Sequence, residues 1–321
     1  RKELPGVVAR LGYKKALVVT DKGLMKFGVA KMVLDVLDEA AIPYEIYDEV
    51  KPNPTVTNVK MGVEACKKAE ADFIIAIGGG SSMDTAKGIG IICNNPEFSD
   101  VISLEGVADT KKKTVPIMAL PTTAGTAAET TINYVIIDEE KQKKMVCVDP
   151  NDIPAVAIID AELMYSLPKS LTAATGMDAM THAIEAYVST ANCNYTDPLA
   201  LWAIKMIQTH LVKSYGEDME SRDQMHDAQC LAGMAFSNAL LGIVHSMAHK
   251  TGAAFKNGHI IHGAANAMYL PKVIKYNSKD PEAKKRYGEI ADFMKLGGNN
   301  DDEKVDLLIA YLRKMNDDLN I

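Results

Sequence analysis

Four of the seven histidines in this 321-residue chain lie between positions 245 and 262, in a segment of mostly apolar and small residues. His245 and His249 are four residues apart, and so are Asp178 and His182 further up the chain. Residues four apart lie on the same face of an α-helix, so each pair would present two metal-binding side chains together. A carboxylate and several imidazoles suit iron, zinc, nickel or cobalt. The spacing therefore predicts a catalytic metal site.

Helix packing must bring the two pairs together, because they are far apart in the sequence. The expected ligands are Asp178, His182 and His245. The fourth ligand can be either His259 or His262. His249 would then lie one turn from a ligand and face the pocket without binding the metal, a position suited to relaying a proton. The alternative is that these histidines only cap and pack helices, which is the usual interpretation of a single histidine on an apolar face.

A glycine run follows the apolar segment 73–77 and reads Gly78-Gly79-Gly80-Ser81-Ser82-Met83-Asp84 before a helical pattern continues. A strand, glycines and a helix start can hold a pyrophosphate, because the backbone can approach closely and the helix start offers unpaired N–H groups. Ser81 and Asp84 also have the spacing of a capping box. The run matches neither G-x-G-x-x-G nor the Walker A pattern, and its alternative interpretation is a glycine turn without a ligand.

Two further features favour a nucleotide with a diphosphate. The loop Pro121-Thr122-Thr123-Ala124-Gly125-Thr126 follows an expected strand at 115–120. It offers hydroxyls at the carboxyl end of a parallel strand, where ligands bind in open α/β sheets. Asp21 ends the first clear strand and could accept hydrogen bonds from an adenosine ribose, although a lone Asp there is often only a turn residue.

The elements that must position these residues divide the chain in two. The first part alternates β-branched runs with amphipathic patterns, which is typical of a parallel α/β sheet. After Pro168 the sequence becomes rich in Ala, Met and Leu and reads as successive helices, on which His210 and His226 are expected at the surface. We predict an α/β dinucleotide-binding domain over 1–167 and an all-helical, metal-binding catalytic domain over 168–321 that is incomplete at its C-terminus. Strands are expected at 16–20, 44–47, 73–77, 115–120, 134–137 and 155–159, and helices at 29–40 and 56–69.

Composition narrows the partners and the compartment. A net charge of −7 argues against nucleic acid or an anionic membrane as a partner. No apolar run approaches the roughly 18 residues of a spanning helix, and the first residues lack the apolar core of a secretory signal. Five widely spaced cysteines without a C-x-x-C motif fit a reducing cytoplasm. We therefore expect a cytoplasmic protein without a nucleic-acid or membrane partner.

Over essentially its whole length the chain resembles the iron-containing (group III) alcohol dehydrogenases, and within them the lactaldehyde reductase or propanediol oxidoreductase branch. Their nucleotide-binding and metal-binding domains form a dehydroquinate synthase-like fold. The resemblance rests on several motifs: Val19-Thr20-Asp21-Lys22-Gly23, Pro52-Asn53-Pro54, Gly79-Gly80-Ser81 with Asp84, Pro121 to Glu129, Gly176-Met177-Asp178-Ala179, Thr181 to Glu185, His245 to His249, and His262-Gly263-Ala264-Ala265-Asn266.

The resemblance assigns roles to individual residues. It implies metal ligation by Asp178, His182, His245 and His262, with His249 as a non-ligand pocket histidine. The family pattern His-Gly-x-Ala-Asn selects His262, whereas the usual spacing from the preceding histidine would select His259. The implied cofactor contacts are Asp21 and Asn53 at the adenosine end, Gly79, Gly80, Ser81 and Asp84 at the pyrophosphate, Thr122, Thr123 and Thr126 along the cleft, and Thr131, Asn133 and Lys144 at the ribose and nicotinamide.

The implied activity is a metal-dependent, NAD(H)-linked alcohol dehydrogenase or aldehyde reductase. It would act on small primary alcohols or diols such as 1,2-propanediol and lactaldehyde, with Fe²⁺ or Zn²⁺ as the metal. Asp21 favours NAD over NADP, because a carboxylate accepts from a free ribose 2′-OH and repels a 2′-phosphate. A homodimer is expected, since relatives often pair through an edge strand near the N-terminus, although the first strand of the family is expected to be missing or cut here.

Other functions fit parts of the same pattern. Within the superfamily they are a 1,3-propanediol, butanol or glycerol-type polyol dehydrogenase, or a cyclase resembling dehydroquinate synthase. Outside enzymes, the alternative is a nucleotide-binding or filament-forming module. Such a module does not require a cluster of metal-binding side chains. The two pairs, Asp178 with His182 and His245 with His249, therefore favour an enzyme.

Overall fold

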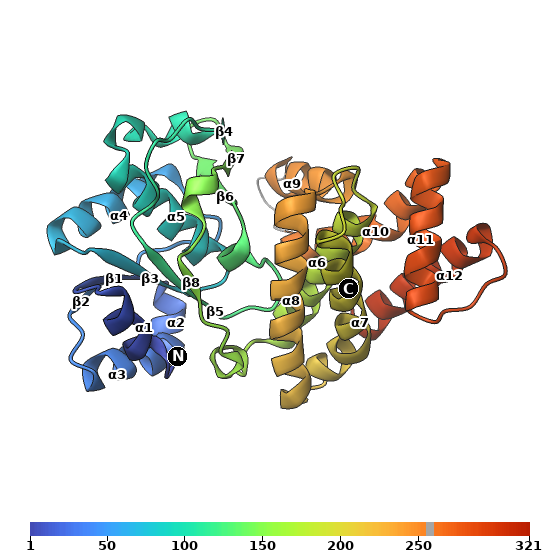
Figure 1. Cartoon of the computed structure of the whole chain (residues 1–321), viewed down its shortest axis with the longest axis horizontal. Coiled ribbons are helices and arrows are strands. Elements are labelled where there is room, and N and C mark those ends of the chain that lie inside the picture. The colour runs from blue at the N-terminus through green and yellow to red at the C-terminus, as the bar shows by residue number, and fades with distance from the viewer. Residues whose placement is uncertain (255–259) are drawn as a thin grey trace. The chain divides into compact units, whose positions relative to one another are not determined.

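The computed structural model describes residues 1–254 and 260–321 and shows two compact units (Figure 1). The α/β unit contains Arg1–Thr122 and Ala128–Leu163. The helical unit contains Thr123–Ala127 and Met164–Ile321. The short loop Thr123–Ala127 therefore belongs to the helical unit, although the chain on both sides of it belongs to the α/β unit.

A parallel sheet forms the centre of the α/β unit. Every residue of its three inner strands is buried, as expected where helices cover both faces of a parallel sheet; these strands are β1 (Ala16–Val19), β3 (Phe73–Gly78) and β5 (Ile117–Pro121). All neighbouring strands in the sheet are parallel, in the order β2 (Tyr44–Tyr47), β1, β3, β5 and β8 (Val156–Ala157).

Alternate side chains of β1 serve two separate cores. Ala16 and Val18 pack with α1 (Leu4–Leu11) and α3 (Val29–Glu39), whereas Leu17 and Val19 pack with α4 (Val56–Ala69) and α5 (Gly80–Asn94). In Figure 1 these two pairs of helices lie on opposite sides of the sheet. The short helix α2 (Lys22–Lys26) follows β1 directly. The helices expected at 29–40 and 56–69 are confirmed, because their apolar positions repeat at the helical period and line these cores.

A second, smaller sheet corrects one part of the strand prediction. The strand expected at 134–137 lies in this sheet as β6 (Asn133–Asp138), antiparallel to β7 (Lys143–Val148), with β4 (Gly106–Val107) on the other side of β7. Lys143 and Lys144 begin β7. Side chains alternate between the two faces of a strand, so Lys143 is exposed and Lys144 is half-buried on the other face.

Short 3₁₀ turns connect the elements of the α/β unit. They are η1 (Pro96–Phe98), η2 (Val101–Leu104), η3 (Ala128–Thr130), η4 (Pro150–Asp152) and η5 (Ala161–Met164). The strand expected at 155–159 is only the two-residue β8, which pairs with β5.

Seven helices are described in the helical unit: α6 (Lys169–Val188), α7 (Thr196–Tyr215), α8 (Met219–Ala239), α9 (Ile243–Ala254), α10 (His262–Asn277), α11 (Pro281–Phe293) and α12 (Asp301–Asp318). Helix α6 packs against α7, α8 and α10 and is buried along most of its length. Small residues allow this close packing, since a Cβ on Gly176 would lie 2.1 Å from Leu211 of α7.

Two histidines outside the predicted site lie on these helices. His210 on α7 is half-buried, and its Nδ1 lies 3.2 Å from the hydroxyl of Ser221. The expectation that His226 is at the surface is wrong, because its exposed fraction is 0%. The sequence around His226 is polar, but the face of α8 that carries this residue packs inside the helical unit. Local polarity does not predict which face of a helix is buried.

No single helix among residues 1–254 and 260–321 has the length and apolar character needed to cross a membrane. Met219–Ala239 and Ile243–Thr251 meet that requirement only as a pair, and the pair is bent by 102°.

Candidate active site

Helix α6 carries the first two predicted ligands. Asp178 and His182 are four residues apart, so both point from the same face of this buried helix. His245 reaches the same point from α9, and each of the three residues is at most 4% exposed. One donor atom from each residue lies within 4.8 Å of the others. The two sequence pairs are thus brought together by helix packing.

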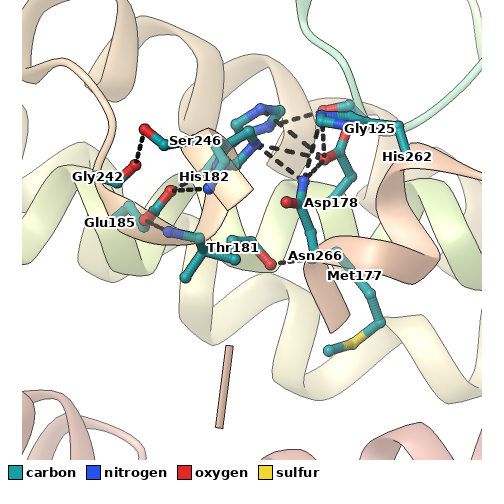
Figure 2. Close-up of polar contacts among 12 residues, drawn as sticks. Gly125, Met177, Asp178, Thr181, His182, Glu185, Gly242, Ser246, His262 and Asn266 are labelled. Atoms are coloured by element: carbon teal, nitrogen blue, oxygen red, sulfur yellow. Dashed lines mark hydrogen bonds and ion pairs between the residues drawn. The ribbon is translucent and has the colours of Figure 1, made fainter. Parts of the chain in front are cut away.

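His262 also approaches this cluster, from the first residue of α10. The carboxylate oxygen Oδ1 of Asp178 lies 3.5 Å from Nε2 of His245, 3.7 Å from Nε2 of His262 and 4.0 Å from Nε2 of His182. In Figure 2 the side chains of Asp178, His262 and Asn266 point toward one another. The His262 side chain is 32% exposed, so it lies on the open side of the cluster. The alternative ligand His259 lies outside the described residues.

His249 lies one turn after His245 on α9 and is half-buried. Its ring centroid is 4.9 Å from that of His262 and 6.4 Å from that of His245. The imidazole therefore lies beside the cluster, on the side where the exposed His262 lies.

Two of the imidazoles are oriented by hydrogen bonds to Nδ1, the ring nitrogen that faces away from Asp178. Nδ1 of His182 lies 3.2 Å from the carbonyl oxygen of Gly125, which can only accept, so this nitrogen carries the proton. Nδ1 of His245 lies 2.5 Å from the Glu185 carboxylate and donates to it in the same way. Both Nε2 atoms are then directed at Asp178. Protein groups that bind the far nitrogen of an imidazole in this way are usual around metal sites.

Burial and charge set the protonation of these groups. Burial lowers the pKa of His182 to about 3, which leaves its imidazole neutral. Burial would raise the pKa of Asp178, but the neighbouring imidazoles, His182 first, outweigh it and lower that pKa. For His245 burial acts to lower the pKa, yet hydrogen bonds to Asp178 and Glu185 raise it to about 9. A bound cation would take the place of the Nε2 proton of His245.

The donor set fits a divalent metal. The side-chain amide nitrogen of Asn266 lies 2.7 Å from Oδ1 of Asp178, 3.1 Å from Nε2 of His245 and 3.3 Å from Nε2 of His262. With Nε2 of His245 unprotonated, three acceptors converge on one amide nitrogen, which has only two hydrogens to donate. Two buried carboxylates, Asp178 and Glu185, also contact His245. A divalent cation would satisfy the remaining acceptor and neutralise both charges.

The glycine turn of the α/β unit has the shape needed for close approach of a phosphate. Gly78 has φ of 151°, and a Cβ on it would lie 2.2 Å from Oγ of Ser82, so only glycine fits. Helix α5 begins at Gly80 with Gly79 as its N-cap and no side-chain cap. The predicted capping box is therefore wrong: Ser81 is already helical, and its hydroxyl accepts from the backbone N–H of Asn53 instead.

The other predicted cofactor residues occupy both units. Asp21 is the N-cap of α2, where its Oδ1 accepts from the backbone N–H of Leu24 at 2.9 Å. Burial lowers the pKa of Lys144 on β7, and burial raises that of Asp84 on α5 to about 7. The described positions divide as follows: Asp21, Asn53, Gly79, Gly80, Ser81, Asp84, Thr122, Thr131, Asn133 and Lys144 belong to the α/β unit, and Thr123 and Thr126 to the helical unit.

Lys87 is a polar residue whose importance the sequence did not reveal. Its side chain is 0% exposed, and Nζ donates to the carbonyl oxygens of Thr131 and Asn133 at 2.6 and 2.9 Å. The hydroxyl of Thr131 lies 3.0 Å from Nζ and a carboxylate oxygen of Asp152 lies 3.7 Å away. The ammonium therefore ties α5 to the segment with two predicted cofactor residues. The only signal was a lysine in the middle of a helix, directly before its apolar second half.

Comparisons with known proteins agree with both units. The family model "Iron-containing alcohol dehydrogenase" matches residues 1–161, and "Fe-containing alcohol dehydrogenase family, C-terminal" matches residues 172–321. A lactaldehyde reductase from Escherichia coli strain K12 is 50% identical over 316 residues, which are 98% of this chain and 81% of that protein. An NADPH-dependent butanol dehydrogenase from Clostridium saccharobutylicum is 50% identical over 311 residues, 96% of this chain and 79% of that protein.

Solved structures show the same architecture. An alcohol dehydrogenase from Oenococcus oeni has a TM-score of 0.94 at 38% identity and is matched over 100% of this chain and 83% of its own. A sulfoacetaldehyde reductase from Bifidobacterium kashiwanohense, solved in complex with NAD⁺, has a TM-score of 0.88 at 28% identity, over 100% of this chain and 82% of its own.

The α/β unit with its glycine turn and the helical unit with its carboxylate and imidazoles match the two domains of a family of metal-dependent oxidoreductases. The chain belongs to the iron-containing alcohol dehydrogenase family. Its fold class, its enzyme class and the iron and NAD cofactors of the family agree with the sequence predictions, which are confirmed.

Proposed function

We propose that the protein interconverts small primary alcohols or diols and their aldehydes with NAD(H), with lactaldehyde and 1,2-propanediol as representative substrates. The observation that carries the proposal is the convergence of Nε2 atoms on Oδ1 of Asp178, at distances of 3.5 to 4.0 Å. The 50% identity to a lactaldehyde reductase supports the choice of substrate.

The proposed metal ligands are Asp178, His182, His245 and His262. When bound, a divalent cation supplies Lewis-acid polarisation of the substrate oxygen. The protein holds the donor atoms in place, because Gly125 and Glu185 accept from the Nδ1 atoms of two of the imidazoles. Alcohol oxidation releases a proton as well as a hydride, and we assign the proton to His249, whose ring lies 4.9 Å from that of His262.

The proposed cofactor site uses the uncapped start of α5, where Gly79, Gly80 and Ser81 would hold the pyrophosphate. The other proposed cofactor residues are Asp21, Asn53, Asp84, Thr122, Thr123, Thr126, Thr131, Asn133 and Lys144. NAD is proposed over NADP because one oxygen of Asp21 serves the helix cap and the other is left to accept from a ribose hydroxyl.

Metal analysis combined with an oxidation assay tests this function. Protein purified with and without oxygen should contain stoichiometric iron or zinc and should oxidise NADH with lactaldehyde or glycolaldehyde. Absence of both metal and NADH turnover would instead support a nucleotide-binding module.

A butanol dehydrogenase using NADPH is the second candidate, because such a protein is equally identical to this chain at 50%. Faster turnover of butanal with NADPH than of lactaldehyde with NADH would favour it and would overturn the role given to Asp21.

His249→Ala tests the proton assignment. The metal content should stay at the wild-type value, while turnover falls by about 10²–10⁴-fold and its dependence on pH changes. His210→Ala is the matched control, since His210 lies on α7 and contacts Ser221 rather than the cluster. If the two variants have the same turnover across the pH range, His249 does not move the proton.

A cytoplasmic homodimer is also proposed. The edge strand β2 supports it, because Ile46 on this strand is 40% exposed and its outer backbone groups can pair with a second strand. The molar mass in solution, measured by light scattering, decides between monomer and dimer.

A further inference from the structure

Glu185 is a buried carboxylate that contacts His245, and the family motif gives it no place among the metal ligands or the cofactor contacts. It lies on α6 three residues after His182 and seven after Asp178, so the three side chains share one face of the helix. Its exposed fraction is 4%. Such a buried charge must be held by donors, and Figure 2 shows Glu185 beside Gly242 at the start of α9.

The carboxylate contacts both backbone N–H groups and a side chain of α9. Oε1 accepts from the backbone N–H of Val244 at 2.8 Å, and Oε2 lies 3.4 Å from the backbone N–H of His245. Oε2 also accepts from Nδ1 of the His245 ring at 2.5 Å. Glu185 therefore caps the start of α9 from another helix and, with the same carboxylate, fixes the ring of a residue on that helix.

Gly242, just before α9, lies close to this carboxylate. A Cβ on Gly242 would lie 2.9 Å from Oε1 and 3.5 Å from Cδ of Glu185. The carboxylate therefore fills the space beside the start of α9.

We propose that Glu185 is a positioning residue that selects Nε2 of His245 as the metal donor. A carboxylate can only accept, so the proton of the neutral imidazole stays on Nδ1 and the lone pair on Nε2. The cap on α9 sets the distance of the ring from Asp178, which is 3.5 Å between Nε2 and Oδ1. This inference rests on the proposed ligation by Asp178 and His245.

Glu185→Gln separates ring selection from a purely structural cap. A glutamine has one accepting oxygen and one donating amide, so it cannot accept from both the Val244 N–H and Nδ1 of His245. If its oxygen keeps the cap, its amide faces Nδ1 and directs the ring proton to Nε2. We expect the dissociation constant for Zn²⁺, measured by chelator competition, to rise about ten- to a hundredfold. Glu289→Gln is the matched control, because Glu289 accepts from the hydroxyl of Tyr187 in the same unit.

Histidine ¹⁵N spectra of the zinc-loaded proteins give a second readout that a structural role would not move. The wild type and Glu289→Gln should show the His245 ring with its proton on Nδ1 and zinc on Nε2. Glu185→Gln should lose this signature. A Zn²⁺ dissociation constant and a His245 spectrum equal to those of Glu289→Gln would overturn the proposal.

Two further variants keep the test decisive. Glu185→Asp keeps the charge but shortens the side chain by one methylene group, so its carboxylate cannot reach both the Val244 N–H and Nδ1 of His245. It should also weaken Zn²⁺ binding, and unchanged binding overturns the proposal even if Glu185→Gln fails to fold. Asp178→Asn tests the ligand set itself. Should the wild type bind Zn²⁺ no better than Asp178→Asn, the proposed function fails, whereas a wild-type affinity in Glu185→Gln alone refutes only the role of Glu185.

Discussion

Gly263, the second residue of α10, lies so close to α6 that one added methyl group should disturb the metal cluster. A Cβ on Gly263 would lie 1.9 Å from the carbonyl oxygen of Ala174 and 3.1 Å from the Cβ of Asp178. The first contact is far below the 3.0 Å that Cβ atoms essentially never cross. The obstacle is backbone rather than a flexible side chain, so Gly263→Ala must move α10 away from α6 by about 1 Å.

The displacement acts on two residues of the cluster. His262 and Asn266 lie on successive turns of α10, and they approach Oδ1 of Asp178 to 3.7 and 2.7 Å. Metal sites hold their ligand distances to about 0.2 Å, so a shift of about 1 Å removes His262 from the coordination. We expect the metal dissociation constant to rise at least tenfold, which corresponds to about 1.4 kcal/mol. Overpacking should also lower the free energy of unfolding by about 1–3 kcal/mol.

Chelator competition with Zn²⁺ and thermal unfolding of the metal-free protein measure the two effects separately. Gly6→Ala is the matched control, because Gly6 is also helical and its Cβ would meet nothing within 4 Å. That variant should bind metal as the wild type does and gain up to about 1 kcal/mol of stability. If Gly263→Ala binds Zn²⁺ and unfolds like Gly6→Ala, then α10 does not hold the cluster in the way described.

Two predictions concern the α/β unit. Lys87→Met leaves Asp152 buried without its cation. The free energy of unfolding, measured with urea, should therefore fall by about 3–5 kcal/mol, and NADH binding should weaken. An unchanged unfolding midpoint would refute the role of the ammonium. Glu139 accepts from the hydroxyl and the backbone N–H of Thr57 at 2.6 and 3.1 Å, and these bonds, the hydroxyl first, lower its pKa. The bonds to Glu139 stabilise the folded protein fully above the ordinary pKa of a Glu, and this stabilisation is lost as the pH falls through the lowered pKa. Thr57→Val should therefore lower the free energy of unfolding by at most about 1 kcal/mol at neutral pH and leave it unchanged in strong acid. An equal effect of Thr57→Val at both pH values, measured by urea unfolding, would contradict this.

Local patterns were sufficient for features that depend on neighbours in the chain. The alternation of apolar runs predicted the parallel sheet, and the apolar period of α4 predicted its bounds at Val56–Ala69. The spacing of Asp178 and His182 predicted that both side chains share a helix face, because the helical repeat alone decides it.

Features that depend on distant contacts could not be predicted in this way. The burial of Lys87 follows from carbonyl oxygens 44 and 46 residues away, and Glu185 is held by groups 59 and 60 residues away. The Ser81 capping box failed for a related reason: its hydroxyl is bound by Asn53, 28 residues before it. Each of these polar groups has a partner that the sequence nearby does not show.

The loop Thr123–Ala127 gives the chain an interlaced connectivity, because it leaves the α/β unit, joins the helical unit and returns. During synthesis the Gly125 carbonyl emerges 57 residues before His182, the imidazole that it orients. The loop must therefore wait, without its final partner, until α6 has left the ribosome. A gene cut after residue 163 would likewise separate this loop from the imidazole, so the helical half expressed alone should lack the Gly125 carbonyl and recover it only when the two fragments are combined.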